Sequence, residues 1–345
     1  MAGKKKNSDH FNVFLISLKI KTEKFLTWRK RRKLRKKEKL KKKNPVLDWV
    51  EAFLSAVIIV FFVNQYLIQA YQIPTTSMVK TLEIGDRIFV DKITYGPELL
   101  PGVMKLPGFK KIERGEIAIF ESPEYLSKGP IYDIITRIVY MMTFSFIDLD
   151  RDPNGEPAKH FLIKRVVGIP GDRIRQNYGL IEILPKGERN WFAESMLKEK
   201  KQMKYTLNRR FFDNKAYSLF EDVGKGLGFI EAGLPLKEEE QEKLNKIVEI
   251  INDQGVWRKI RLCDGIFLDK VRYRILSEIK PNDWIYKKEW RKIEIGRYIP
   301  EGYILPLGDN RDNSRDGRIF GPVKIKKVLG KSLFRFWPFN RFGRI

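Results

Sequence analysis

The sequence predicts a mainly β protein, in which coiled antiparallel sheets form a core with an inserted α/β cap, preceded by one N-terminal transmembrane helix. Three observations support this fold class. A long apolar run follows a strongly basic tract, short alternating segments bounded by Gly and Pro follow the run, and a charged, less regular section interrupts them. Short strands with such turns are typical of coiled antiparallel sheets.

Composition limits the classes of protein that this chain can represent. Its 345 residues leave room for two folded units, and 43% hydrophobic residues are ample for a core. The single cysteine, Cys263, excludes an internal disulfide and is best interpreted as a small core residue. His10, His160 and Cys263 are too few ligands for a zinc cluster, so we expect neither a metal ion nor a cofactor.

The positive charge is concentrated at the N-terminus. The formal net charge is +25, and residues 1–43 contain 18 Lys and Arg against 3 Asp and Glu. Such a tract can bind the phosphates of nucleic acid. We favour another interpretation, because Lys and Arg within about 15–20 residues of a membrane span mark its cytoplasmic side and attract anionic lipid headgroups. Residues 11–18, which are too few to span, fit a basic amphipathic helix at the membrane surface.

The apolar run covers residues 52–68. With the flanking Trp49 and Tyr71 it reaches the roughly 20 residues that a bilayer requires. A cleaved signal peptide is the alternative, but the region lacks a short small-residue cleavage signature, and the basic tract before it is unusually long. The sequence therefore predicts an uncleaved span with about 275 residues outside the cytoplasm, a placement that also argues against nucleic acid as a partner.

Beyond the span, the apolar pattern predicts short strands. They cover residues 85–91, 115–120, 161–167, 180–184, 265–268, 303–307 and 328–334. Two further apolar segments are not predicted to be strands. Residues 138–147 are too few to span and suit a core segment or one that dips into the membrane surface. Residues 99–109 form a loop that fits either shallow membrane contact or buried packing.

The section from Trp191 to Trp290 is charged and predicts the cap. Within it, apolar residues recur at helical spacing from Leu244 to Ile251, so one helix is expected there. The chain is then expected to divide into five parts. They are a basic cytoplasmic tail (1–46), the transmembrane helix (47–70), the first part of the core (71–190), the cap (191–290) and the second part of the core (291–345).

Ser77 lies just beyond the predicted span, in the stretch 73–82, which reads IPTTSMVKTL. An extended chain covers at most about 3.3–3.6 Å per residue, so Ser77 is held within roughly 30 Å of the bilayer. Pro74 fixes one backbone angle and constrains the segment. The stretch fits either a polar juxtamembrane linker or a nucleophilic hydroxyl held beside the membrane.

A serine hydroxyl needs a base to act as a nucleophile, and histidine is the usual one. His10 lies on the cytoplasmic side of the predicted span and cannot reach Ser77. His160 lies on the same side as Ser77, but Lys164 is the better candidate for the base. Lys164 shares its strand face with Leu162 and Val166, so its side chain is expected to point into an apolar interior. Burial disfavours an ammonium group and lowers the pKa of a lysine, which supplies a neutral amine base. A solvated strand lysine is the alternative.

A third polar constellation follows the predicted strand at 303–307. Residues 307–318 read LGDNRDNSRDGR. Alternating Asp and Arg can lock a loop through charge-assisted hydrogen bonds, and such a loop would form a rigid wall that positions Ser314. A solvated polar loop is the alternative.

Together these residues resemble bacterial type I signal peptidases, the membrane-bound serine/lysine proteases that remove signal peptides from exported proteins. Four separated blocks occur in the order found in that family. They are residues 73–82, 85–92, 164–172 (KRVVGIPGD) and 308–318. The resemblance extends from Trp49 to about Asp172 and from Tyr303 to the C-terminus.

The resemblance implies a role for each candidate residue. Ser77 would be the nucleophile and Lys164 the general base. Ser314 would supply a hydroxyl that orients the lysine, and Thr75 would join the Ser77 amide in the oxyanion hole. The residues implied as structural supports are Asp309, Asp316 and Arg318.

The resemblance also implies an activity and a location. The protein would be a serine endopeptidase that cleaves exported preproteins after small residues, typically alanine, through an acyl-enzyme. It would be a single-pass protein of the bacterial cytoplasmic (inner) membrane, with its N-terminus in the cytoplasm and its catalytic core on the outer, periplasmic or extracellular face. Its partners would be preproteins and the bilayer, with anionic lipids at the basic tail.

Two positions depart from the family pattern. Lys80 stands where the family usually has proline, and Gly317 stands where it usually has serine. Lys80 also creates the Ser-x-x-Lys spacing of penicillin-binding proteins and serine β-lactamases, but the Ser-x-Asn and Lys-Thr-Gly motifs of that class are missing. That class is the alternative enzyme. A polybasic single-pass scaffold protein is the non-enzymatic alternative.

Overall fold

The structure is a computed structural model that describes residues 16–34, 45–100, 104–143, 146–151, 155, 160–203, 205, 207, 214–239, 241–242, 245 and 254–345. The chain divides into two compact units, Met1–Ile59 and Val60–Ile345, which are described separately. The first contains a helix at residues 16–34 and most of helix α2 (Pro45–Phe62). Within the helix predicted between Leu244 and Ile251, only Asn245 is described, and it is helical; residues 11–15 of the predicted surface helix lie outside the described residues.

One helix in the described part of the chain is long and apolar enough to cross a membrane. It runs from Val46 to Leu67, has a mean hydropathy of 2.3, and includes both α2 and the π-helical turn η1 (Val63–Leu67). Its 22 residues meet the length that a bilayer core requires. The length and composition agree with the predicted transmembrane helix.

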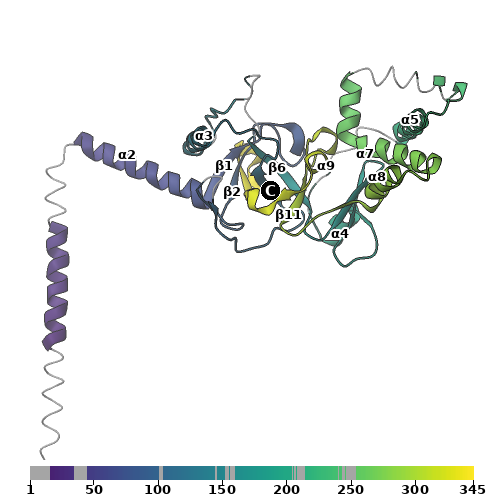
Figure 1. The fold of residues 1–345 in the computed structure, drawn as a ribbon. Coiled ribbons are helices and arrows are strands. Elements are labelled where there is room, and N and C mark those ends of the chain that lie inside the picture. Colours follow the sequence, from purple (N-terminus) through teal and green to yellow (C-terminus); the bar gives the residue numbers. More distant parts are fainter. Residues whose placement is uncertain are drawn as a thin grey trace, which may run out of the picture. The chain divides into compact units, whose positions relative to one another are not determined.

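A curled antiparallel sheet forms the centre of the second unit (Figure 1). Its strand order is β1-β2-β13-β5-β6-β11-β12, and β14 pairs with β13. The strands are β1 (Ile68–Gln72), β2 (Arg87–Asp91), β5 (Ile117–Glu121), β6 (Phe161–Gly168), β11 (Tyr303–Leu307), β12 (Val323–Lys324), β13 (Val328–Trp337) and β14 (Gly343–Arg344). Strand β13, near the C-terminus, lies between β2 and β5 and pairs with both. The C-terminal part of the chain therefore joins two strands of the N-terminal part into one sheet.

Two smaller sheets accompany it. One has the order β10-β7-β8-β9, and the other pairs β3 with β4. Their strands are β3 (Glu98–Leu100), β4 (Met104–Lys105), β7 (Arg173–Asn177), β8 (Leu180–Leu184), β9 (Phe192–Ala193) and β10 (Arg297–Tyr298). Short single-turn helices occur at η2 (Thr76–Met78), η3 (Arg311–Asn313), η4 (Ile325–Lys327) and η5 (Phe339–Arg341).

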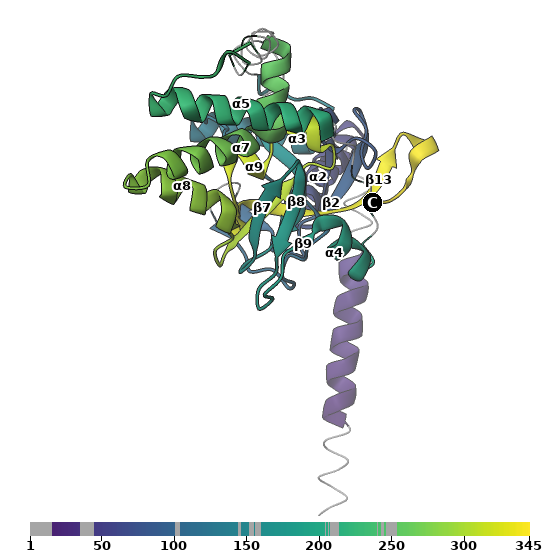
Figure 2. The same ribbon diagram turned by 90° about the vertical axis from the view of Figure 1, so that its right-hand side faces the viewer.

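Helices contribute more of the described chain than the expected mainly β class implies. They are α3 (Pro130–Met142), α4 (Glu194–Lys200), α5 (Asn214–Ala232), α7 (Gln254–Ile279), α8 (Trp284–Ile295) and α9 (Gly317–Phe320). Figure 2 shows α5, α7 and α8 gathered beside β7 and β8. The section expected to be an α/β cap is therefore largely helical where it is described, with β9 as a short strand.

Most of the predicted strands are confirmed, and two of them, β8 and β11, have the predicted bounds. The strand predicted at residues 265–268 is wrong, because this run lies inside α7. Phe267, Leu268 and Val271 are buried at the spacing i, i+1, i+4, so the short apolar run belongs to one face of a helix. The apolar segment 138–147 begins in the last turns of α3.

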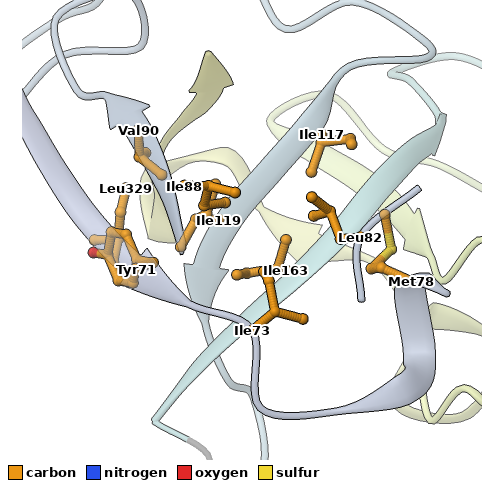
Figure 3. Packing of buried hydrophobic residues seen from close by; sticks show 10 residues of the cluster. All are labelled: Tyr71, Ile73, Met78, Leu82, Ile88, Val90, Ile117, Ile119, Ile163 and Leu329. Carbon is orange, nitrogen blue, oxygen red and sulfur yellow. The ribbon is translucent and has the colours of Figure 1, made fainter. Parts of the chain in front are cut away.

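The core of the main sheet includes Ile73 and Met78, which lie on either side of Ser77 in the sequence (Figure 3). Its buried cluster comprises Tyr71, Ile73, Met78, Leu82, Ile88, Val90, Ile117, Ile119, Ile163 and Leu329. Along β2, buried residues alternate with half-exposed ones, as expected for a strand with one face on a core. Because Ile73 and Met78 are both in this cluster, the chain around Ser77 is anchored on either side.

We expect the core to tolerate truncation poorly at Ile88. Ile88 is fully buried, whereas nearby Ile84 is 59% exposed. Ile88→Ala should lower the free energy of unfolding by about 2–5 kcal/mol, because it leaves a cavity as well as losing apolar burial. Ile84→Ala should change it by no more than about 0.5 kcal/mol. Urea unfolding of the detergent-solubilised chain measures both, and equal effects would contradict the packing described.

Candidate active site

Ser77 lies in η2, at the base of a loop that two backbone hydrogen bonds close. The Ile73 N–H donates to the Asp86 carbonyl at 2.8 Å, and the Gly85 N–H donates to the Ile73 carbonyl at 2.9 Å. The next turn is fixed by Leu82, whose N–H donates to the Met78 carbonyl at 2.8 Å. Ser77 is buried and lies on a segment whose backbone is fixed on both sides.

Lys164 projects from β6 toward Ser77. Its Nζ lies 2.7 Å from Ser77 Oγ, within hydrogen-bond distance, and donates to the Ile163 carbonyl at 3.0 Å. The Lys164 side chain is 3% exposed, and Val166, two residues along the same strand face, is fully buried. The pairing of Lys164 with Ala118 of β5 holds its backbone in the sheet. The arrangement joins an amine and a hydroxyl that are 87 residues apart in sequence.

Thr75 is a second polar neighbour of the serine hydroxyl. Its Oγ1 lies 3.2 Å from Ser77 Oγ, and its backbone is extended just before η2. The structure therefore brings three of the predicted site residues, Thr75, Ser77 and Lys164, into one cluster of polar side chains.

The polar loop after β11 holds the backbone of the serine turn. The Asn310 N–H donates to the Ser77 carbonyl at 3.0 Å, and Asn310 Nδ2 donates to the Thr76 carbonyl at 3.0 Å. Gly308 permits this approach, because a Cβ there would lie 2.6 Å from the Ser77 carbonyl oxygen. Ser314 is fully buried against Gly308, and its Oγ makes no hydrogen bond in the part of the chain that the structure describes. No hydrogen bond thus joins Ser314 to Lys164 among those residues.

Asp309 is the buried carboxylate that connects this loop to β6. It accepts from Arg165 Nε at 2.7 Å, from Arg165 Nη2 at 2.6 Å, and from Thr81 Oγ1 at 2.6 Å. Bidentate pairs of this kind fix orientation as well as contributing energy. Sequence reasoning did not assign Arg165 a role, because an arginine in a strand gives no sign that its partner lies 144 residues away.

Asp316 is held by the loop itself. It accepts from the Gly308 N–H at 2.9 Å and from Arg318 Nε at 2.9 Å. Burial alone would raise the pKa of Asp316, but the Arg318 guanidinium and these hydrogen bonds hold that pKa below its ordinary value. Arg318 Nη2 also donates to the Arg311 carbonyl at 2.5 Å, so one arginine ties three points of the loop together.

A second buried ion pair was missed by sequence reasoning. Arg311 Nη2 donates to Glu194 Oε1 at 2.7 Å, and the Tyr205 hydroxyl donates to the same carboxylate at 2.9 Å. Burial opposes ionisation of Glu194, yet Arg311 brings the pKa of Glu194 below its ordinary value. The section predicted as a cap thus contributes, through α4, one buried carboxylate that holds Arg311 of the polar loop.

Ser77 and Lys164 line a cleft of about 580 Å³. The cleft is bounded by the segment after β1, by the start of β6 and by α3. Its lining residues are Tyr71, Gln72, Ile73, Pro74, Thr75, Ser77, Met78, Thr136, Arg137, Tyr140, Phe146, Asp148, Asp150, Arg151, His160, Phe161, Leu162, Ile163 and Lys164. The wall is therefore mixed, with both apolar and charged side chains.

His160 lines the same cleft without taking part in the serine cluster. It stacks on Tyr125 with ring centroids 3.9 Å apart. Burial, and after it the Arg137 charge, lowers the pKa of His160 to about 4, so its imidazole is neutral at pH 7. Ser77 Oγ lies within hydrogen-bond distance of Lys164 Nζ and Thr75 Oγ1.

Lys80, the lysine of the Ser-x-x-Lys spacing, is exposed on the surface of the serine loop. Its backbone has φ 80°, in the left-handed region, and its N–H donates to Glu83 Oε1 at 3.4 Å. The lysine whose amine reaches Ser77 Oγ is Lys164.

Comparison with known proteins gives one consistent result. A family model described as signal peptidase, peptidase S26, matches residues 46–337. The chain is 26% identical to signal peptidase I of Buchnera aphidicola subsp. Acyrthosiphon pisum, over 88% of this chain and 79% of that protein. It is 26% identical to signal peptidase I of Pseudomonas aeruginosa, over 85% and 69%, and 25% identical to that of Aquifex aeolicus, over 84% and 82%.

We expect Lys80→Gly and Lys80→Pro to have opposite effects on stability. A left-handed φ costs a non-glycine residue about 1–2 kcal/mol, so glycine should raise the free energy of unfolding by up to about 1 kcal/mol. Proline fixes φ near −65° and lacks the N–H that reaches Glu83, so it should lower this free energy by at least about 1 kcal/mol. Thermal unfolding beside a Lys80→Ala control measures both; a stabilising proline would contradict the φ observed.

The lowered pKa of Asp316 predicts a loss of stability in acid. The unfolded chain binds this proton near pH 4 and the folded chain only at lower pH, so the contribution of Asp316 is complete above pH 4 and is lost as the pH falls through the folded pKa. The loss of unfolding free energy caused by Asp316→Asn should therefore be smaller at pH 3 than at pH 6. Denaturant titrations at the two pH values measure this difference, and an equal or larger loss at pH 3 would refute the prediction.

Proposed function

Because this chain belongs to the S26 family of signal peptidases, we propose that it cleaves signal peptides from exported preproteins with Ser77 as nucleophile and Lys164 as general base. The observation that carries the proposal is the 2.7 Å contact between Lys164 Nζ and Ser77 Oγ, at the wall of a cleft large enough for a peptide segment. A nucleophile within hydrogen-bond reach of its base is the geometry that covalent catalysis requires.

The base must be a neutral amine. With 3% of the Lys164 side chain exposed, the ammonium form loses most of the hydration that stabilises it, and burial therefore favours the neutral form. Neutral Nζ then accepts the proton of Ser77 Oγ as that oxygen forms a bond to the scissile carbonyl carbon. The Lys164 ammonium next protonates the leaving amine, which departs as the N-terminus of the mature protein, and an acyl-enzyme remains.

Water completes the reaction. Lys164 accepts a proton from water, the hydroxyl oxygen attacks the ester carbon, and Ser77 is released with its proton restored while the signal peptide leaves as a carboxylic acid. In both steps we place the oxyanion between the Ser77 amide and the Thr75 hydroxyl, which lies beside Ser77 Oγ. A donor in such a position contributes about 3–4 kcal/mol to the transition state.

The residues of the 308–318 loop support the positions of Ser77 and Lys164 indirectly. We propose that Asp309, Asp316 and Arg318 hold the 308–318 loop, which in turn holds the Ser77 carbonyl through Asn310. Ser314 is proposed as the hydroxyl that orients Lys164. Its Oγ is buried beside Gly308 and has no other hydrogen-bond partner among the described residues, so it is free to turn toward the amine.

The cleft suggests which peptides fit. Apolar side chains of Tyr71, Ile73, Met78 and Phe161 are part of the wall that also contains Ser77. We propose that this space accepts small side chains, typically alanine, at the first and third positions before the cut. Larger side chains would have to displace core residues such as Ile73 and Met78.

The location is proposed from the sequence. The Val46–Leu67 helix would cross the cytoplasmic (inner) membrane, with the basic tail in the cytoplasm against anionic lipids and the catalytic unit on the outer face. A span confines enzyme and substrate to one plane, because the apolar segment of a signal peptide lies in the same bilayer. This confinement raises their effective concentration.

Three variants test the mechanism. Ser77→Ala and Lys164→Ala should each lower preprotein cleavage by at least about 10³-fold, because either change removes the same chemical step. Lys80→Ala should keep substantial activity, since Lys80 is exposed. Wild-type cleavage should also fall as the pH decreases, because the ammonium form of Lys164 accumulates and cannot accept a proton.

The same variants separate the alternatives. Cleavage is measured on a preprotein in lipid, and acylation on a labelled β-lactam. An essential Lys80 with a dispensable Lys164 would move the site to the Ser-x-x-Lys pair and favour a penicillin-binding enzyme. A wild-type chain that cleaves no preprotein and binds no β-lactam would favour the scaffold interpretation.

A further inference from the structure

One part of the cleft lining is a row of aromatic rings in mutual contact. Tyr71 lies edge-on to Phe161 with ring centroids 5.5 Å apart, and the ring of Tyr140 is 6.0 Å from that of Tyr71. His160 extends the row, because its ring centroid is 4.4 Å from that of Phe161. These spacings are those of interacting aromatic pairs. The set, here called the aromatic wall, is Tyr71, Tyr140, His160 and Phe161, and all four residues line the cleft.

The polar groups of the aromatic wall are engaged with the protein or uncharged. The Tyr71 hydroxyl donates to Gln69 Oε1 at 3.0 Å, and the Tyr140 hydroxyl accepts from the Gln72 N–H at 3.4 Å. The imidazole of His160 is neutral at pH 7, since its pKa is lowered to about 4. The wall therefore presents mainly ring surface to a ligand.

The cation beside the wall is balanced by carboxylates. Arg137 lies over Phe161, with its guanidinium carbon 5.0 Å from the ring centroid. The same guanidinium pairs with Glu98 at 3.2 Å and with Glu121 at 3.3 Å. A ligand carboxylate would have to compete with these two for Arg137. The aromatic wall therefore favours an apolar or aromatic side chain over an acidic one.

The aromatic wall lies at the end of the cleft nearest the candidate span. Tyr71 is four residues beyond the end of the Val46–Leu67 helix. Tyr140 precedes Met141, whose carbonyl accepts from Nδ2 of Asn64 in that helix at 3.0 Å. Under the proposed function, the apolar segment of a signal peptide lies in the bilayer and precedes the cut. The residues before the cut would therefore pass the aromatic wall as they approach the serine.

Strand geometry determines which of these residues meets the wall. An extended peptide beside β6 advances about 3.3 Å per residue, as the strand itself does. Phe161 precedes Lys164 by three residues, so it lies beside a peptide residue roughly three to five positions before the cut. Side chains of an extended peptide alternate, so the fifth shares a face with the first and third. Those two are proposed to face Ile73 and Met78, which belong to the same core cluster as Tyr71 (Figure 3).

We propose that the aromatic wall is a subsite for a large apolar or aromatic side chain at the fifth position before the cut. This proposal rests on the proposed function and names a further part of the substrate that the same cleft selects. A side chain held against the rings fixes the register of the peptide on Ser77. The cleavage site is then chosen by one large residue as well as by the two small ones.

A set of preproteins that differ only at the fifth position before the cut tests the subsite. That position carries Phe, Leu, Ala or Asp, and kcat/KM is measured with the full chain in lipid. The Phe and Leu preproteins should have kcat/KM about tenfold above that of the Ala preprotein, and the Asp preprotein should fall below it. Moving the phenylalanine to the fourth position should remove its advantage, because its side chain would then point to the opposite side.

Variants of the aromatic wall locate the contact. Tyr140→Ala and His160→Ala should each lower the Phe-to-Ala ratio of kcat/KM to about threefold or less, whereas Tyr140→Phe and His160→Phe keep a ring and should retain the ratio. Tyr298→Ala is the control, because it removes a ring that is 47% exposed and does not line the cleft. The ratio is independent of the fraction of active protein, since one sample cleaves both preproteins.

Binding separates the subsite from the proposed chemistry. The Ser77→Ala chain in detergent should bind a fluorescent signal peptide with Phe at the fifth position about tenfold more tightly than one with Ala, although it cleaves neither. Equal affinities together with equal kcat/KM for the preproteins would overturn the subsite and leave the proposed function intact. A ratio unchanged in both alanine variants would place the preference elsewhere and would also overturn it. A wild-type chain that prefers Phe in binding but cleaves no preprotein would contradict the proposed chemistry alone.

Discussion

The geometry of the site depends on one constraint, which is that three distant chain segments must meet at Ser77. Ser77 and Lys164 are separated by 87 residues, and Arg165 and Asp309 by 144. Sheet pairing positions β6, the core cluster anchors the serine turn, and Asn310 holds the Ser77 carbonyl. No local segment contains the site, so it exists only when the whole main sheet is folded.

Buried ion pairs make that meeting rigid. Asp309 pairs with Arg165 of β6, and Asp316 pairs with Arg318; both carboxylates lie in a loop that contacts the serine turn directly. Removing one partner from such a pair leaves a buried charge uncompensated, at a cost of about 3–5 kcal/mol. The pairs therefore oppose displacement of the loop. Because Asn310 of this loop holds the Ser77 carbonyl, the pairs also oppose movement of Ser77 away from Lys164.

Sequence reasoning predicted the features that local patterns encode. The apolar helix was recognisable from its length and hydropathy, and β8 and β11 from apolar runs closed by turn residues. The strand predicted at 265–268 failed because four apolar residues do not distinguish a strand from one face of α7. The roles of Arg165 and Glu194 could not be predicted, since each depends on a partner more than 100 residues away.

The two departures from the resembled family have local physical explanations. Lys80 has φ 80°, which a proline ring cannot adopt. The backbone of the serine loop in this chain is therefore incompatible with proline at position 80. At Gly317, a Cβ would lie 2.8 Å from both Leu305 Cδ1 and the Pro306 carbonyl oxygen. A serine there would force the loop away from β11, so this packing requires glycine.

The protonation state of Lys164 is the most direct test of the central claim. In a chain labelled with ¹⁵Nζ-lysine, the Lys164 signal is identified by its loss in Lys164→Ala. Lys92 and Lys105, whose pKa values burial lowers to about 8, provide internal references for buried amines. The account predicts the nitrogen shift of a neutral amine for Lys164 at the pH of activity. An ammonium shift that persists to about pH 10, as for a solvated lysine, would contradict it.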